Sequence, residues 1–155
     1  MIYIGLAIAA LGIGVFLYDY TESLRKTKDS YVQICEFLVH VRGEIEGSAK
    51  PIDKIVREYY RGRETSLIAG AFSSLPGEID LASLCILGED RERIRIYFKS
   101  FGTAPSKEEE LRRLNALILP IEQKRDLTCE RTGKRIKSFY LIYAAALLSA
   151  VLLVC

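Results

Sequence analysis

The sequence predicts an all-α membrane protein, with two terminal transmembrane helices and a cytoplasmic helical-hairpin domain whose long C-terminal helix enters the membrane. Charge is distributed very unevenly, since all 22 Lys and Arg and all 20 Asp and Glu lie in residues 19–137. Within that segment, apolar residues recur at the 3–4-residue spacing of a helix face. Signals for β-strands are weak throughout. The expected divisions are a transmembrane helix over 1–20, an all-helical cytoplasmic domain over 21–137 and a transmembrane helix over 138–155.

The first expected membrane span is the apolar run from Ile2 to Tyr18. Its 17 residues have a rise of about 1.5 Å each and reach roughly 26 Å, close to the ~30 Å hydrocarbon core of a bilayer. A cleaved signal peptide is the alternative, but a basic N-terminal region is missing and the first charged side chain is Asp19. The second run, Phe139 to Cys155, is apolar on all sides, whereas a buried core helix usually keeps a polar stripe.

Basic residues next to both runs predict the orientation of the chain. Lys and Arg flanking a span stay on the cytoplasmic side of a membrane. Both flanks belong to the middle segment, so we expect this segment to be cytoplasmic and both termini to lie on the other side. The basic residues are Arg25, Lys26 and Lys28 after the first run and Arg131, Lys134, Arg135 and Lys137 before the second.

The middle segment is expected to fold as a series of helices. The first covers residues 21–46, continues from the first span and has an apolar stripe. Pro51 fits the first position of a second helix, because its missing N–H is not needed there. Two short helices are expected over 66–75 and 78–87. The stripe of the first helix is Tyr31, Ile34, Cys35, Leu38, Val41 and Ile45, and that of the second is Ile52, Ile55, Val56 and Tyr59.

The last part of the segment is expected to form two further helices. Asp90 is placed as the cap of one, which Gly102 stops. Ser106 and Glu109 then form an S-x-x-E capping box at the start of the final helix. This helix runs into the membrane as one rod unless Pro120, which removes a backbone hydrogen bond, breaks or kinks it. The acids and arginines of residues 89–95 are interpreted as surface pairs.

Catalytic patterns are missing from the sequence. No P-loop occurs, and His40 is the only histidine and lies near an apolar stripe, which favours a packed or surface side chain over a base or a metal ligand. The net charge of +2 gives no indication of nucleic-acid binding. We therefore expect no enzymatic activity and no cofactor. The alternative is a two-span membrane enzyme that uses a carboxylate pair, for which Glu44 and Glu109 are the residues to substitute.

Small residues at four-residue spacing occur in both apolar runs. Such pairs let helix backbones approach closely in lipid. We expect the two spans to pack on each other or on a partner, although Gly and Ala are also common in membrane helices. The pairs are Gly5 with Ala9, Ala10 with Gly14, Ala145 with Ser149, and Ala146 with Ala150.

The layout resembles the stage III sporulation protein AB family over essentially the whole chain. Arg25-Lys26 follows the first span, and Glu44-Ile45 is followed after five residues by Pro51-Ile52, where that family has Glu-Ile and then Pro-Leu. Phe101-Gly102 ahead of the capped final helix is similar to the family's Leu-Gly. Departures from the family pattern are Gly47 in place of an aromatic residue, Pro120, and Ala144–Ala146 and Ser149 in place of glycines.

The resemblance implies a non-enzymatic platform in the mother-cell membrane around the forespore. Such a protein belongs to a secretion-like complex needed for endospore formation, and it is similar to the platform proteins of type II secretion and type IV pilus machines. The implied partners are a cytoplasmic ATPase, other membrane subunits and the lipid bilayer, and a homo-oligomer is compatible with this layout. A platform of a pilus or secretion machine outside sporulation is the alternative. The candidate structural or interface residues are Glu44, Pro51, Gly102, Ser106 and Glu109.

Overall fold

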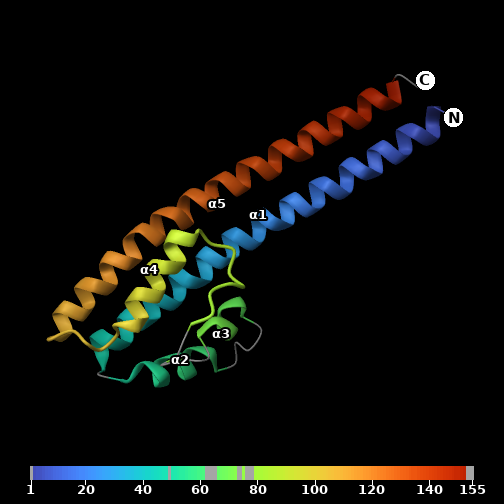
Figure 1. The fold of residues 1–155 in the computed structure, drawn as a ribbon. Helices are drawn as coiled ribbons and strands as arrows, with labels where there is room; N and C mark the ends of the chain where they lie inside the picture. Colours follow the sequence, from blue (N-terminus) through green and yellow to red (C-terminus); the bar gives the residue numbers. More distant parts are fainter. Residues whose placement is uncertain (1, 49, 62–65, 73–74, 76–78, 153–155) are drawn as a thin grey trace.

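The computed structural model of the chain is all-helical, and two long antiparallel helices form its frame (Figure 1). The structure describes the backbone of residues 2–48, 50–61, 66–72, 75 and 79–152; the side chains of residues 2–11, 67, 147 and 150–152 lie outside this description. No strand occurs in the described residues. The helices are α1 (Ile2–Gly47), α2 (Ile52–Tyr60), α3 (Leu67–Phe72), α4 (Gly88–Lys99) and α5 (Lys107–Leu152).

Helices α1 and α5 have 46 residues each and lie side by side, with both chain termini at the same end (Figure 1). Contacts at two levels of the pair show which residues of α1 and α5 lie opposite each other. The rings of Tyr20 and Phe139 meet edge to face with centroids 5.2 Å apart, and Arg125 Nη1 lies 3.2 Å from Cys35 Sγ further along. Both helices continue without a break through the expected boundaries at residues 20–21 and 137–138.

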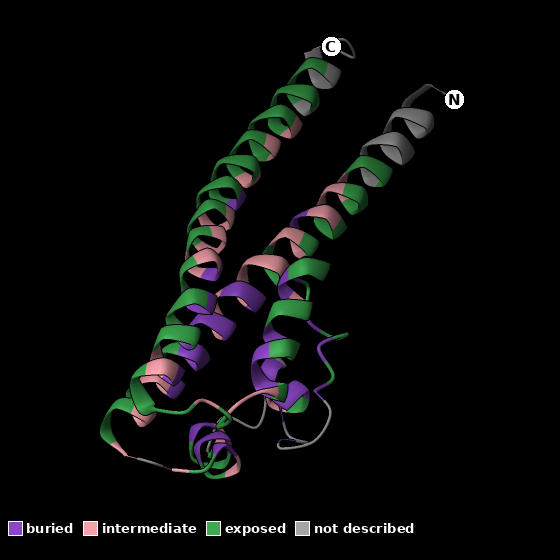
Figure 2. Cartoon of the chain, turned by 60° about the vertical axis from the view of Figure 1, so that its left-hand side comes forward, coloured by how far each residue is buried: buried purple, intermediate pink, exposed green. Residues whose placement is uncertain are grey.

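The hydrophobic core lies in the half of the α1–α5 pair that is remote from the termini. Figure 2 shows buried residues gathered there, where α2, α3 and α4 cover the pair, and mostly exposed residues toward the termini. The structure confirms the predicted stripes of α1 and α2 as core, with Ile45 packed at the core's edge. Helix α5 contributes Leu114, Leu117, Ile118 and Ile121.

An aromatic cluster around Phe37 joins four helices. Phe37 is fully buried, although it lies outside the predicted α1 stripe. Its ring centroid lies 5.2 Å from that of Tyr59 in α2, 4.6 Å from that of Phe72 in α3 and 5.8 Å from that of Phe98 in α4. Helix α1 therefore buries a second line of residues, because small helices cover it on a side that a single amphipathic stripe does not indicate.

The helix predicted over residues 78–87 is wrong for its described part, 79–87, which forms turns. Three backbone N–H groups of this segment, those of Ala82, Cys85 and Leu87, bond to side chains instead of forming helical bonds. Ala82 N donates to Asp80 Oδ1 at 2.9 Å, and Cys85 N donates to Ser30 Oγ of α1 at 3.2 Å. Such side-chain bonds compete with a helix. Of the helix predicted over 66–75, α3 covers Leu67–Phe72, Ser66 and Leu75 lie outside α3, and residues 73–74 lie outside the described residues.

Three helix boundaries differ from the sequence-based predictions. Helix α4 begins at Gly88 with Leu87 as its N-cap, so Asp90 lies inside the first turn and does not cap it. Pro51 is the N-cap of α2, with φ −67° and ψ 150°, and not its first helical residue. Helix α4 ends at Lys99, and Gly102 follows with a φ of +76° that favours glycine.

Helix α5 passes through Pro120 without a break. Its neighbours Leu117, Ile118 and Ile121 are all buried in the core. Packing on both sides of the proline holds the helical backbone, although Pro120 has no N–H to donate. Of the break or kink expected at Pro120, the break does not occur, since α5 runs as one helix from Lys107 to Leu152.

Candidate functional site

The residues singled out from the sequence lie at the end of the molecule remote from the termini. We call this region the hairpin end; it consists of the last turn of α1, the start of α2, the α4–α5 turn and the start of α5. Glu44 lies in α1, Pro51 caps α2, Gly102 lies in the α4–α5 turn, and Ser106 and Glu109 begin α5. The fold thus brings residues from distant parts of the sequence to one end.

Lys50 joins Glu44 of α1 to Glu58 of α2. Its Nζ lies 2.8 Å from Glu44 Oε2 and 2.7 Å from Glu58 Oε2. The hydrogen bond that Lys50 donates to Glu44 is the main cause that lowers the pKa of Glu44. The hydrogen bonds that Lys50 donates, first to Glu44 and then to Glu58, raise the pKa of Lys50. A carboxylate held ionised by such a partner is a weak base. Glu44 therefore fixes the α1–α2 connection and is poorly suited to proton abstraction.

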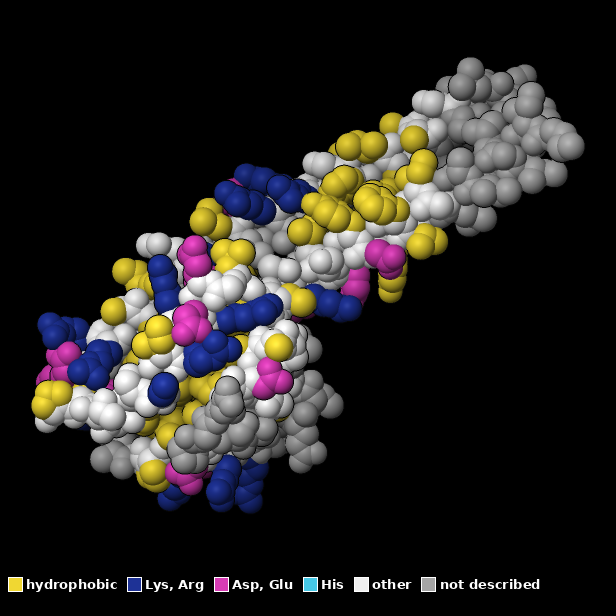
Figure 3. Space-filling view, viewed as in Figure 1, with side chains coloured by type: hydrophobic (Ala, Val, Ile, Leu, Met, Phe, Trp, Pro, Cys, Tyr) yellow, Lys and Arg dark blue, Asp and Glu magenta, His cyan; other side chains and the backbone are white. Residues whose placement is uncertain are grey.

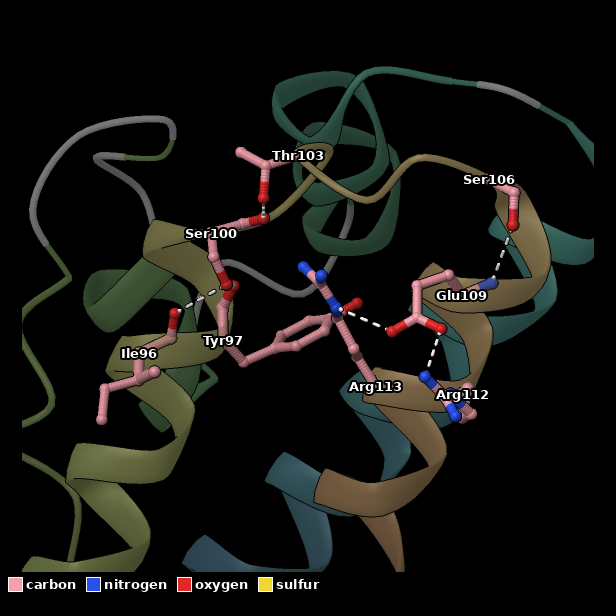
Figure 4. Close-up of polar contacts among 8 residues, drawn as sticks. All are labelled: Ile96, Tyr97, Ser100, Thr103, Ser106, Glu109, Arg112 and Arg113. Carbon is pink, nitrogen blue, oxygen red and sulfur yellow. Dashed lines mark hydrogen bonds and ion pairs between the residues drawn. The ribbon is translucent and has the colours of Figure 1, made fainter.

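The α4–α5 turn is closed by its own side chains (Figure 4). Thr103 Oγ1 donates to the carbonyl of Ser100 at 2.7 Å, and Glu109 N donates to Ser106 Oγ at 3.2 Å. Ser106 therefore caps α5. The Glu109 carboxylate does not complete the predicted capping box; it lies 2.6 Å from Arg112 Nη2 and 3.4 Å from Arg113 Nε.

A hollow of about 240 Å³ opens between these elements. Lys107 crosses beside it, because its Nζ donates to the Glu46 carbonyl at 2.6 Å and ties α5 to α1. The hollow combines an apolar floor with two lysines and two serines, so it offers both apolar contact and hydrogen-bond donors. Its lining is Ile45, Ser48, Lys50, Phe101, Gly102, Ala104, Ser106, Lys107 and Glu110.

Glu110 is a buried acid that the sequence did not reveal. It is only 6% exposed, although it belongs to an acidic run that looks solvated. Burial first, and then the nearby Glu110 charge, raise the pKa of the Tyr97 hydroxyl. Glu110 therefore lines the hollow and also lies close to Tyr97 of α4, so the pair belongs to the α4–α5 contact.

A second buried polar cluster joins α1, α4 and α5. Asp90 is fully buried, and Lys124 Nζ lies 2.7 Å from its Oδ1 and 2.9 Å from its Oδ2. Tyr31 donates to Asp90 Oδ2 at 2.7 Å and accepts from Leu87 N at 3.2 Å. Burial is the main cause that raises the pKa of Tyr31, and together with the Asp90 carboxylate it brings this pKa to about 12.

The predicted surface pairing of residues 89–95 therefore holds only in part. Glu92 and Arg95 do pair at the surface, but Asp90 is core and Arg91 Nη2 donates to the Leu84 carbonyl. The signal for Asp90 is its spacing from Ile94 and Tyr97, which places it on the buried face of α4. Asp90 and Lys124 neutralise each other, so the cluster is suited to holding helices together.

Among the described residues, the other potentially reactive side chains are not grouped into a catalytic site. Burial is the main cause that raises the pKa of the Cys35 thiol, which keeps it protonated at neutral pH. His40 packs against the ring of Tyr59, with centroids 5.0 Å apart. Within the described chain, no group of three His, Cys, Asp or Glu is placed to hold a metal ion.

The other end of the molecule consists of the terminal segments of α1 and α5, which carry an unusual amount of exposed apolar surface. A search of the described residues finds no helix long and apolar enough to cross a membrane. The structure nevertheless exposes large apolar side chains on these segments, and on the face drawn in Figure 3 yellow side chains gather toward the termini. They are Ile13, Val15, Phe16, Tyr18, Tyr140, Leu141, Ile142 and Leu148.

The small residues of these segments differ in their environment. A Cβ atom on Gly14 would lie 3.3 Å from the Tyr143 hydroxyl, so the Tyr143 side chain of α5 reaches the α1 backbone there. Ala145, Ala146 and Ser149 are exposed. The side chains at Gly5, Ala9, Ala10 and Ala150 lie outside the described residues. Beside Gly14 a hollow of about 170 Å³ is lined by Leu17, Tyr18, Thr21, Phe139, Tyr140 and Tyr143.

Comparisons with known proteins identify no relative of this chain. No family model, no curated protein and no solved structure matches it.

Proposed function

We propose that this chain is a non-enzymatic membrane platform protein that docks partners at its hairpin end. The main observation that supports this proposal is the difference between the two ends of the α1–α5 pair. One end exposes large apolar side chains and has no charge beyond Lys137, whereas the other is a packed, charged domain. The resemblance to stage III sporulation protein AB specifies the rest of the proposal, namely the mother-cell membrane complex of endospore formation.

The terminal segments support membrane insertion through the cost of their exposure to water. Apolar surface that water contacts costs roughly 25 cal/mol per Å² relative to an apolar environment. Phe16 is 69% exposed and Leu141 71% exposed, and they lie on different helices of the same end. Two paired helices with apolar side chains directed outward are favoured in lipid, where the backbone hydrogen bonds are satisfied within each helix.

The hairpin end supports docking because it combines a hollow with charged side chains at its rim. Lys50 and Lys107 line the hollow, and both are held in place by bonds to α1 or α2. A rigid, preformed surface loses little side-chain entropy on binding. The cytoplasmic ATPase of the same complex is the proposed partner.

The candidate carboxylates favour a platform over the enzyme alternative. Glu44 is paired with Lys50, and Glu109 with Arg112 and Arg113. Neither is placed as an acid–base pair with the other, since each is directed to its own cation. A platform of a pilus or secretion machine outside sporulation would share this geometry, and expression restricted to endospore formation distinguishes the two.

Co-purification from membranes under mild detergent tests the docking proposal. The ATPase is expected to be retained by the full chain and lost when Lys50→Glu and Lys107→Glu are combined, because both charges at the hollow are reversed. A matched pair on α4, Arg93→Glu with Lys99→Glu, should retain it, since both residues are exposed away from the hollow. No retention by the folded wild-type chain, or equal retention by all three, would contradict the proposal.

A further inference from the structure

Basic side chains of α1 and α5 lie at the same level of the pair, directly below the uncharged terminal segments. The level is fixed by Tyr20, whose ring contacts Phe139 and whose hydroxyl lies 3.1 Å from Arg135 Nη1. Arg131, Lys134, Arg135 and Lys137 of α5 are exposed, as are Arg25 and Lys26 of α1. Figure 3 shows Lys and Arg side chains gathered on α5 immediately before the apolar area. We call these six residues the basic collar.

Much of the collar's charge is not neutralised within the chain. Lys134 pairs with Glu130, and Lys26 lies 3.9 Å from Glu22. Arg25, Arg131 and Lys137 have no ion pair with any described residue. Residues 131–137 contain no acid. The collar therefore keeps a surplus of positive charge that faces outward.

The collar borders a surface suited to lipid. Tyr140 and Tyr18 are exposed at the first turn beyond it, where amphipathic rings favour the headgroup layer. The 170 Å³ hollow is lined by Thr21 and Phe139 on the side of the collar, and its other walls are Gly14, Leu17 and three tyrosines, so most of its surface is apolar. A lipid with an anionic headgroup and an acyl chain matches this arrangement, with the headgroup at the collar and the chain in the hollow. A free phosphate ion would contact only the collar.

We propose that the basic collar binds anionic phospholipid headgroups, with an acyl chain along the hollow between α1 and α5. The inference rests on the proposed membrane insertion and adds a lipid specificity to it. Each Lys or Arg near an anionic membrane surface strengthens attraction on the order of fivefold. The attraction falls when salt screens the charges.

Native mass spectrometry of the full chain, released from mild detergent, measures this binding. We expect phosphatidylglycerol to be retained at least tenfold more than phosphatidylcholine with the same acyl chains, and retention to fall at high salt. The variant with Arg131, Lys134, Arg135 and Lys137 all changed to Gln should lose the difference. A control with Arg57, Arg61, Arg93 and Lys99 changed to Gln should keep it, because these exposed residues lie on or beside α2 and α4.

Two outcomes would overturn the inference: equal retention of the two lipids, or an unchanged preference in the collar variant. Inorganic phosphate is the third arm, and binding of phosphate as tight as that of the lipid would also contradict it. Resistance of the chain to alkaline extraction from membranes is measured separately. A chain that resists extraction but shows no lipid preference refutes the lipid site alone, whereas one that is extracted refutes the membrane proposal.

Discussion

At the residue scale, the carboxylate of Asp90 is held inside the domain by side chains from two other helices. Removing one partner of a buried ion pair is costly because the remaining charge loses its compensation. Here the anion is fully buried, whereas the Lys124 side chain remains 27% exposed. The Tyr31 hydroxyl also donates a hydrogen bond to Asp90, so the Asp90 carboxylate links α4 to both α1 and α5.

Asp90→Asn is expected to lower the free energy of unfolding by about 3 kcal/mol, the lower end of the range for a broken buried pair, because water reaches Lys124. Denaturant unfolding of the purified chain in mild detergent measures this. Asp126→Asn is the control, since Asp126 pairs with Arg125 at the surface and surface pairs contribute at most about 1 kcal/mol. Equal losses in the two variants would show that the buried cluster has no special role.

The raised pKa of Tyr31 predicts a loss of stability at alkaline pH. Its pKa is raised from 10.0 to about 12 in the folded chain. The unfolded chain then loses this proton first, so the contribution is complete below pH 10 and is lost as the pH rises toward 12. The loss amounts to about 2–3 kcal/mol. The unfolding free energy of wild type should fall more steeply across this window than that of Tyr31→Phe, and parallel pH curves would contradict the prediction.

At the scale of elements, α5 depends on its two ends in different ways. Its first turn contains Glu108, Glu109 and Glu110, which suit the positive end of a helix dipole. Ser106 supplies the cap, while Glu109 is engaged with arginines of the following turn. The terminal half is instead held by its contacts with α1.

Ser106→Ala is expected to destabilise the chain by roughly 1 kcal/mol, because the Glu109 N–H loses its acceptor. Ser106→Asp should restore most of this loss, since Asp is an equally good cap. Thermal unfolding compares these variants with Ser83→Ala, an exposed serine in the loop before α4. If Ser106→Ala matches Ser83→Ala, the cap contributes nothing measurable.

Pro120→Ala is expected to stabilise the chain by on the order of 1–3 kcal/mol, because alanine restores an N–H donor within α5 and removes the ring's clash with the preceding turn. Pro105→Ala, in the loop before α5, is the matched control and should give no gain. The denaturation midpoint of each variant is the measurement. A destabilised Pro120→Ala chain would mean that the proline shapes the rod.

At the scale of the whole molecule, the α1–α5 pair places all exposed charge on one side of the uncharged terminal segments. The proposed topology requires the domain between them to face the cytoplasm. Cys85 is exposed in the loop before α4 and is therefore a natural probe of that side.

In a variant that keeps only Cys85, a membrane-impermeant maleimide should leave intact cells unlabelled and label the cysteine after permeabilisation. The accessible thiol lies on the inner side in the proposed topology, and the membrane alone protects it. Gel-shift of the labelled chain provides the measurement. Labelling in intact cells would reverse the orientation inferred from the basic flanks.

The sequence by itself determined the helical class, the buried stripes of α1 and α2, and the continuity of α1, because apolar spacing and charge distribution are local properties of the chain. Only the tertiary structure decided that residues 79–87 form turns, that Asp90 and Glu110 are buried, and that Phe37 joins four helices. Each depends on partners from distant segments, such as Lys124 for Asp90 and Ser30 for Cys85. Pro120 is a further example, because the packing around it outweighs the strong local preference of proline against a helix.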